Sequence, residues 1–454
     1  MNPLASELAV LEGVQPLRIV GRVAALRGMT VLVEAMAAPV GSLVRIGDGL
    51  AGEGLMGEVV GFDRDRAVVM SLGTGAGVRA GDPVELVETT PTAGSGPGLL
   101  GRVIDGLGRP LDGGEPPRDL RPRALAPTPI GALERRAIDR QLLTGVRAVD
   151  LMTPVGRGQR LGIFAGPGVG KSTLLGQIAR GTDADASVIA LIGERGREVG
   201  EFIEDSLGEE GLKRSVVVVA TGDESPVMRL RAARRACAIA EGFRDDGLDV
   251  LLMMDSVTRF AHAQRQVGLS AGEPPATRGY TPSVFAELAL LLERAGTTRD
   301  GGSITGLYTI LVEGDDMTEP VADAARGILD GHLILSRKLA QAGRFPAIDV
   351  LDSVSRVADR IVSTEHRAAR AQLVRIMAAF AEIEELVQIG AYASGTNHEA
   401  DVAIELRERC EELLRHGSAD RGVAFEDARR VLVELAHQSG ELVARRRASA
   451  GGQR

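Results

Sequence analysis

The sequence predicts an α/β core that is preceded by a small β-domain and followed by a helical domain. The middle of the chain alternates continuous apolar runs with helix-like segments, which is typical of a parallel sheet covered on both faces. The start shows short strands with frequent turns, and the pattern from about residue 356 onward is helical. We therefore expect three domains, at residues 1–90, 91–360 and 361–454.

Residues 1–90 are predicted to form a small barrel or sandwich. The segment "GEVVGFDRDRAVVMSLG" carries short apolar runs interrupted by Gly and Asp, and "VRIGDG" is echoed by "VRAGDPV". Closely spaced turn signals between short strands favour such a unit. Residues 91–131 are rich in Pro and Gly and are predicted to be a connector.

The core is predicted from six apolar runs that helical segments separate. Continuous burial of this kind favours parallel strands. The runs are "RLGIFAG", "SVIALIG", "SVVVVAT", "DVLLMMDS", "SITGLYTILV" and "GHLILS".

Composition argues against nucleic acid as a partner and against secretion. The net charge is −9, and the chain has no Trp, three Tyr and nine Phe, so it lacks a basic field and stacking aromatics. Cys237 and Cys410, the only cysteines, lie in helix-like segments, which favours a reducing cytoplasm over a disulfide framework. The start "MNPLASELAVLEG" does not resemble a secretory signal, and no apolar run reaches the roughly 18 residues that a membrane span needs.

The locally basic segment 229–244, "RLRAARRACAIAEGFR", allows two interpretations. A nucleic-acid patch is one. Helical spacing instead places four apolar residues on one face, which favours a core helix with its arginines outside. The four residues are Leu230, Ala233, Cys237 and Ala240.

The segment "GIFAGPGVGKSTLLGQIA" predicts a phosphate-binding loop between a strand and a helix. It fits the pattern Gly-x-x-x-x-Gly-Lys-Ser/Thr, except that Ala165 replaces the first glycine. Glycines let backbone N–H groups turn toward phosphate oxygens, and the helix start adds positive potential. The predicted nucleotide-binding residues of the loop are Gly166, Pro167, Gly168, Val169, Gly170, Lys171, Ser172 and Thr173.

Composition gives Lys171 added weight. The chain has 53 Lys and Arg, of which three are Lys, and one of the three stands in this loop, where a compact ammonium can enter and a guanidinium cannot. Lys171 would reach the β- and γ-phosphates. Ser172 and Asp255, which ends the apolar run "VLLMMD", are predicted to serve Mg²⁺.

Hydrolysis also needs a group that polarises the attacking water. Glu194 follows the strand "SVIALIG" directly and is the predicted residue for that role. Arg195 would orient Glu194 or touch a phosphate. Glu198 and Glu201 follow at helical spacing and are interpreted as a solvated face.

At this point the sequence resembles the flagellar protein export ATPases, their injectisome relatives in type III secretion and, more distantly, the catalytic subunit of rotary ATP synthases. The likeness spans nearly the whole chain and is densest from about 145 to 360, where "LIGERGREVGEFIE", "GLSAGEPPATRGYTPSVFAEL" and "YTILVEGDDMTEPVAD" stand. The resemblance implies a RecA-like P-loop ATPase core with an N-terminal small β-barrel and a C-terminal α-helical domain. It also implies a homohexameric ring with ATP between subunits.

The resemblance implies further site residues. It gives Glu194 the catalytic carboxylate role, Arg356 of "DSVSR" the role of an arginine finger in the neighbouring site, and Phe345 of "RFPAID" that of an aromatic on adenine. The cofactors would be ATP and Mg²⁺. The loop 272–282 would face the pore and a coiled-coil central stalk protein. "TRGYTPSVF" and "IGAYASGTNHEADVAIELR" favour the flagellar over the injectisome branch.

The implied partners are a stator-like regulatory protein, membrane proteins of the export gate, and export chaperones with their cargo, met at the cytoplasmic face of the membrane at the flagellar base. The segment before "PLRIV" is short for regulator or membrane binding. Two other classes remain as alternatives. A hexameric RNA translocase would need a basic, aromatic channel. A regulatory nucleotide-binding subunit would lack Glu194, which this chain has together with Lys171, Asp255 and Arg356.

Overall fold

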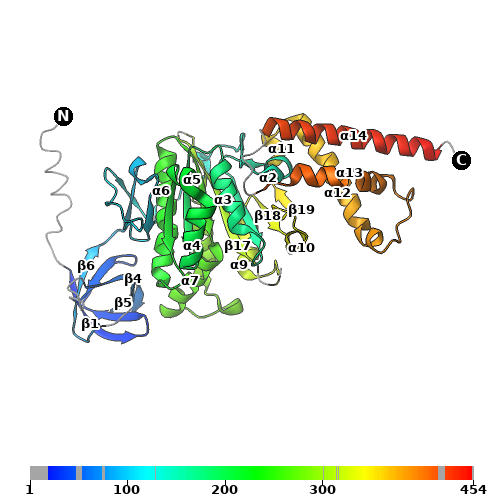
Figure 1. The fold of residues 1–454 in the computed structure, drawn as a ribbon. Helices are drawn as coiled ribbons and strands as arrows, with labels where there is room; N and C mark the ends of the chain where they lie inside the picture. The colour runs from blue at the N-terminus through cyan, green and yellow to red at the C-terminus, as the bar shows by residue number, and fades with distance from the viewer. Residues whose placement is uncertain are drawn as a thin grey trace, which may run out of the picture.

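The computed structural model describes residues 19–451, except 48–53, 74–76, 128, 300, 313, 315 and 418–424. The segment before "PLRIV", with its predicted role toward a regulator, lies outside the described residues. The barrel, the α/β core and the helical domain follow one another along an elongated molecule (Figure 1). The predicted fold class is therefore confirmed.

The N-terminal unit is a closed antiparallel barrel with the strand order β1-β2-β5-β4-β3-β6, in which β1 also pairs with β6. Alternate residues of these strands point inward and fill the barrel with Val, Ile, Leu, Ala and Met. Of the two all-β forms that the sequence allows, the structure has the barrel. Its strands are β1 (Val20–Arg27), β2 (Thr30–Glu34), β3 (Leu43–Ile46), β4 (Leu55–Asp63), β5 (Arg66–Ser71) and β6 (Pro83–Glu88).

The core is a nine-stranded sheet with the order β19-β18-β12-β17-β15-β13-β14-β8, and β16 pairs with β17. All six predicted runs are strands, and they pair in parallel with one another. The edge strand β19 pairs antiparallel with β18, and the short β16 pairs antiparallel with β17. The strands are β8 (Val103–Asp105), β12 (Arg160–Ala165), β13 (Ala186–Ile192), β14 (Ser215–Ala220), β15 (Asp249–Asp255), β16 (Gly296–Thr297), β17 (Ser303–Leu311), β18 (Gly331–Leu335) and β19 (Ile348–Ser355).

The segment 91–131 is more than a connector. It contributes β8 to the edge of the main sheet, where β8 pairs in parallel with β14, and it forms the small sheet of β7 (Thr92–Ser95) with β9 (Arg121–Ala124). The three residues of β8 are too few to show a strand pattern among so many Gly and Pro residues. Shorter elements complete the region: η1 (Pro97–Leu99), η2 (Ala132–Glu134), β10 (Gln141–Leu142) and β11 (Val155–Gly156).

Helices cover both faces of the sheet, and three long helices form the C-terminal domain (Figure 1). The core helices are α2 (Arg147–Met152), α3 (Lys171–Gly181), α4 (Gly196–Glu201), the π-helical η3 (Phe202–Leu207), α5 (Gly208–Lys213), α6 (Pro226–Asp245), α7 (Val257–Ser270), η4 (Thr277–Gly279), α8 (Pro282–Leu292), α9 (Pro320–Ile328) and α10 (Arg337–Gln341). The C-terminal helices are α11 (Ala358–Ile361), α12 (Thr364–Gln388), α13 (His398–Leu414) and α14 (Phe425–Gly451).

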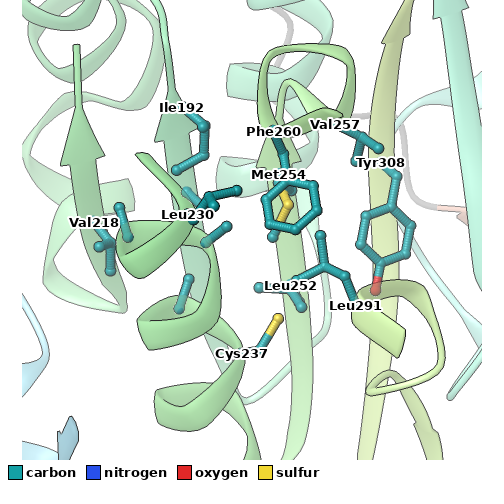
Figure 2. Packing of buried hydrophobic residues seen from close by; sticks show 14 of the residues in the cluster. Ile192, Val218, Leu230, Cys237, Leu252, Met254, Val257, Phe260, Leu291 and Tyr308 are labelled. Carbon is teal, nitrogen blue, oxygen red and sulfur yellow. The ribbon is translucent and has the colours of Figure 1, made fainter. Parts of the chain in front are cut away.

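Helix α6 packs its apolar face against the sheet, as predicted. Leu230 and Cys237 lie over Val218, Leu252 and neighbouring strand residues in Figure 2. The cysteines Cys237 and Cys410 are both buried and free.

The expectation that the arginines of α6 lie outside is wrong for three of them. Arg231, Arg235 and Arg244 are at least 93% buried, because α6 is also covered by the barrel and by the segment around β7. Arg231 pairs with Glu58 of the barrel strand β4, with 2.7 Å between Nη1 and Oε2. Arg235 donates its Nε to the carbonyl of Gly106 at 3.0 Å. The basic segment thus joins the barrel and the segment 91–131 to the core.

We predict that Glu58→Gln lowers the free energy of unfolding by about 3 kcal/mol or more, because it leaves the Arg231 guanidinium buried without a counter-charge. The measurement is urea unfolding of the full chain followed by circular dichroism. Glu34→Gln is the matched control, since Glu34 forms an exposed pair with Arg66 in the same barrel, worth less than about 1 kcal/mol. The double variant Glu58→Leu, Arg231→Met should recover most of the loss, and equal effects of both single changes would contradict this account.

Candidate functional site

The predicted phosphate loop lies between β12 and α3, and its backbone requires glycine at two positions. Gly168 has φ 76° and Gly170 has φ 89°, in the left-handed region that side chains disfavour. A Cβ on Gly168 would meet no atom within 4 Å, so open space lies beside the loop. The first helical hydrogen bond of α3 runs from Leu174 to Gly170, which leaves the preceding amides without helical partners. This geometry forms a cradle for an anion.

Lys171, Glu194 and Asp255 come together at the carboxyl edge of the sheet. The Nζ of Lys171 lies 2.5 Å from Oδ1 of Asp255 and 3.3 Å from Oε1 of Glu194. All three side chains are at least 86% buried. The structure therefore brings the three residues into one cluster, although Lys171 and Asp255 are 84 positions apart in the sequence.

The charges of this cluster shift one another's protonation. Burial disfavours the charged ammonium, but the two carboxylates outweigh it and raise the pKa of Lys171 above its usual value. Burial also raises the pKa of Glu194, against the opposing attraction of Lys171. A carboxylate with a raised pKa is the stronger base toward water, which suits the role predicted for Glu194.

Sequence reasoning missed Thr309, which holds Asp255 in place. Thr309 lies on β17, between β12, which leads into the phosphate loop, and β15, which ends at Asp255. It is fully buried, and its hydroxyl donates to Oδ1 of Asp255 at 2.7 Å. Threonine is a common strand former, so "LYTIL" gave no sign of a role. A polar residue inside so apolar a run was the one available signal.

Phe345 lies at the mouth of a cavity of about 710 Å³ beside the phosphate loop. Its side chain is 45% exposed, and its ring lies 3.5 Å from the position that a Cβ on Gly170 would take. Residues 415–417 of the helical domain close the far side, where the His416 amide donates to the Phe345 carbonyl at 3.1 Å. The cavity is further lined by Val169, Thr173, Gln177, Pro346 and Glu412.

Two predicted residues lie apart from this cluster. Arg195 is exposed at the start of α4 and its Nη1 lies 3.4 Å from Glu198, so the structure does not bring it to Lys171. Arg356 follows β19, is exposed, and has no ion pair with any described residue. The role of each stays a prediction.

The residues present fit ATP and Mg²⁺. Ser172 and Thr173 are exposed in the first turn of α3, so the Ser172 hydroxyl and the Asp255 carboxylate offer the oxygen ligands that Mg²⁺ prefers. The cradle suits a phosphate chain, and the cavity beside it suits a base. When bound, Mg²⁺ supplies charge that neutralises phosphate oxygens. With a nucleotide bound, Lys171 and the loop amides would bind the phosphates, and Glu194 would accept a proton from water.

Three family models match the chain in the order of its domains. The "ATP synthase alpha/beta family, beta-barrel domain" matches residues 16–87, and the nucleotide-binding domain of the same family matches residues 145–355. The "T3SS EscN ATPase C-terminal domain" matches residues 362–434. Within the described ranges, no helix combines the length and apolar character needed to cross a membrane.

Curated relatives and solved structures agree with these models. The flagellum-specific ATP synthase of Treponema pallidum is 51% identical over 422 residues, covering 93% of this chain and 94% of the relative. The type 3 secretion system ATPase of Xanthomonas euvesicatoria is 51% identical over 381 residues, covering 83% and 85%. The assembled ATPase EscN of enteropathogenic E. coli superposes with a TM-score of 0.84 at 40% identity, covering 92% of this chain and all of EscN.

Barrel, nucleotide-binding core and helical domain thus match along nearly the whole chain, and the core brings the phosphate loop and two carboxylates together. The chain belongs to the ATP synthase alpha/beta family, among the flagellum-specific ATP synthases and type III secretion ATPases, and is an ATPase.

Proposed function

We propose that this protein hydrolyses Mg²⁺-ATP between identical subunits of a six-membered ring and that hydrolysis energises protein export by the flagellar type III apparatus. The cluster of Lys171, Glu194 and Asp255 carries the hydrolytic part, because it unites phosphate binding, a base and a metal ligand. Ser172 and Asp255 serve the metal, and Phe345 packs on the base. The flagellar branch is favoured because the Treponema relative matches over 422 residues, compared with 381 for the secretion ATPase.

Arg356 supports a site shared between subunits. It is an exposed cation directly after a strand, and no described carboxylate neutralises it. A guanidinium left unpaired at the surface is suited to reach a phosphate on a neighbouring copy, where it stabilises the charge of the transition state. The relative EscN has been solved as an assembled ATPase and in complex with its central stalk EscO.

The proposed partners follow from the same likeness. The loop 272–282 meets a coiled-coil central stalk protein in the pore of the ring. A stator-like regulatory protein, the export gate membrane proteins, and chaperones with their cargo are further partners, and the ring lies at the cytoplasmic face of the membrane. An injectisome ATPase is the alternative, and the 51% identity to the Xanthomonas enzyme supports it. The second alternative is a catalytic subunit of a rotary ATP synthase, which the family models alone support.

We predict that Glu194→Gln lowers kcat for ATP at least about 100-fold, because the amide cannot accept the proton of the attacking water. Nucleotide affinity should stay within about threefold of the wild type, since Lys171 and the loop amides still bind the phosphates. Steady-state turnover and titration with a fluorescent ATP analogue measure the two effects. Glu201→Gln is the matched control, because Glu201 is exposed on α4 and pairs with Arg197. Near-normal turnover of the Glu194 variant would remove it from this role.

We predict that Arg356→Ala and Glu194→Gln are each nearly inactive alone and regain activity when mixed. In rings assembled from equal amounts, about a quarter of the interfaces combine an intact Glu194 with an intact Arg356 from the neighbour. The measurement is ATPase rate per subunit at several protein concentrations, with light scattering to follow assembly. The wild-type rate should rise steeply with concentration. A mixture no more active than its components would exclude a site shared between subunits.

We predict that this chain restores export of flagellar filament subunits in a bacterium that lacks its own export ATPase, and that the Glu194→Gln variant does not. The reason is that relatives nearly as long as the chain align with its barrel, core and helical domain. The measurement is the amount of filament subunit in the medium, with cellular levels of the variant as control. Restoration of injectisome secretion without flagellar export would instead establish the alternative.

A further inference from the structure

Two loops at the nucleotide edge of the sheet are fastened to each other by side chains. Residues 271–281 connect α7 to α8, and residues 312–319 connect β17 to α9. Tyr280 in the first loop donates its hydroxyl to Oε1 of Glu319 in the second at 2.9 Å. The two residues are 39 positions apart. In Figure 1, α7 and α9 lie toward the same end of the core.

Tyr280 is held rigidly at this contact. It is 97% buried, its hydroxyl lies 3.1 Å from Nε2 of His262, and the guanidinium carbon of Arg265 lies 5.1 Å from the centre of its ring. Glu319 is equally fixed, because its other oxygen accepts the first two free amides of α9 at 2.9 and 3.0 Å. A hydrogen bond to a charged acceptor is stronger than one between neutral groups, and this one is partly buried.

A second link between the loops, from Arg278 to Asp316 at 3.1 Å, is weaker. Both side chains are 40–53% exposed, and pairs of this kind contribute little in water. Of these two links between described residues, the bond from Tyr280 to Glu319 is therefore the stronger.

Both loops lead back to Asp255. Helix α7 begins two residues after Asp255, and β17 carries Thr309, whose hydroxyl binds the Asp255 carboxylate at 2.7 Å. The amide of Leu311, at the end of β17, donates to the hydroxyl of Thr258 in α7 at 2.9 Å. Asp255 is therefore connected to the contact between the loops in two ways. Helix α7 leads from Asp255 to the loop that carries Tyr280, and β17, which binds Asp255 through Thr309, leads to the loop that carries Glu319.

We propose that Tyr280 is a positioning residue for hydrolysis. Its bond to Glu319 fixes the loop after β17, and the strand end then holds Thr309 against Asp255 in the orientation that the reaction needs. Tyr280 acts on Asp255 through Glu319 and Thr309. The inference rests on the proposed hydrolytic function. It implies that the conformation of loop 271–281 affects the orientation of the Asp255 carboxylate.

The test uses the full chain with Tyr280→Phe, which keeps the ring and removes only the hydroxyl. We expect kcat to fall about tenfold, while affinity for a fluorescent ATP analogue without Mg²⁺ stays unchanged and half-saturating Mg²⁺ rises. Tyr392→Phe is the matched control, since Tyr392 also donates to a carboxylate, that of Asp401 at 3.0 Å, but in the helical domain. An effect equal to that of the control would overturn the proposal.

A double-variant cycle separates positioning from a general loss of structure. With Thr309→Val already present, adding Tyr280→Phe should lower kcat by no more than roughly twofold, because the route to Asp255 is already broken. Independent, multiplying effects would overturn the route through Thr309.

Hydrogen exchange of the nucleotide-free protein gives a readout that needs no activity. Tyr280→Phe should speed exchange several-fold in the peptide spanning 309–322, and Tyr392→Phe should not. Unchanged exchange there would overturn the proposal even if kcat fell. A wild-type chain that hydrolyses no ATP under any condition would instead count against the proposed function, and the exchange result would still decide whether Tyr280 holds the loop.

Discussion

The structure of the site depends on one buried cation between two carboxylates. The ammonium of Lys171 lies 2.5 Å from Asp255 and 3.3 Å from Glu194. Buried charges are tolerated only with partners, so the three groups stabilise one another in the absence of ligand. The arrangement requires β12, β13 and β15 to end at one edge, and parallel pairing through β17 provides this. In the proposed function, a phosphate chain that approaches Lys171 would compete with the two carboxylates for its charge and leave them available to metal and water.

Much of this site could be predicted because each residue has a local signature. Lys171 stands in a glycine-rich loop, and Asp255 and Glu194 each follow a run of apolar strand residues. A polar residue directly after a buried parallel strand must lie at the sheet edge where ligands bind, so pattern and function coincide. Thr309 has no such signature, because it faces its partner from inside a strand, and only the strand order reveals that its neighbour is Asp255.

The fold was predictable at the level of domains, and the parts that were not depend on long-range contacts. Arg231 is buried because Glu58, 173 residues earlier, folds onto α6. Helical periodicity identifies one buried face of a helix. Helix α6 is also covered by the barrel on a second face, and nothing in the sequence of α6 indicates this. Strand β8 is held by its pairing with β14. It has three residues, which are too few to show the alternation of a strand in the sequence.

Helix α3 connects the predicted phosphate loop to the helical domain. Its first residue is Lys171, and on the same helix Gln177 donates its amide to the carbonyl of Gly417 at 3.0 Å. On the other side of the cavity, the guanidinium of Arg147 binds the carbonyl of Arg415. Because residues 415–417 line the cavity beside Phe345 and are also bonded to α3, they cannot move away from the cavity without breaking a bond to the helix that begins at Lys171. A movement of residues 415–417 in the helical domain would therefore also affect α3 and Phe345.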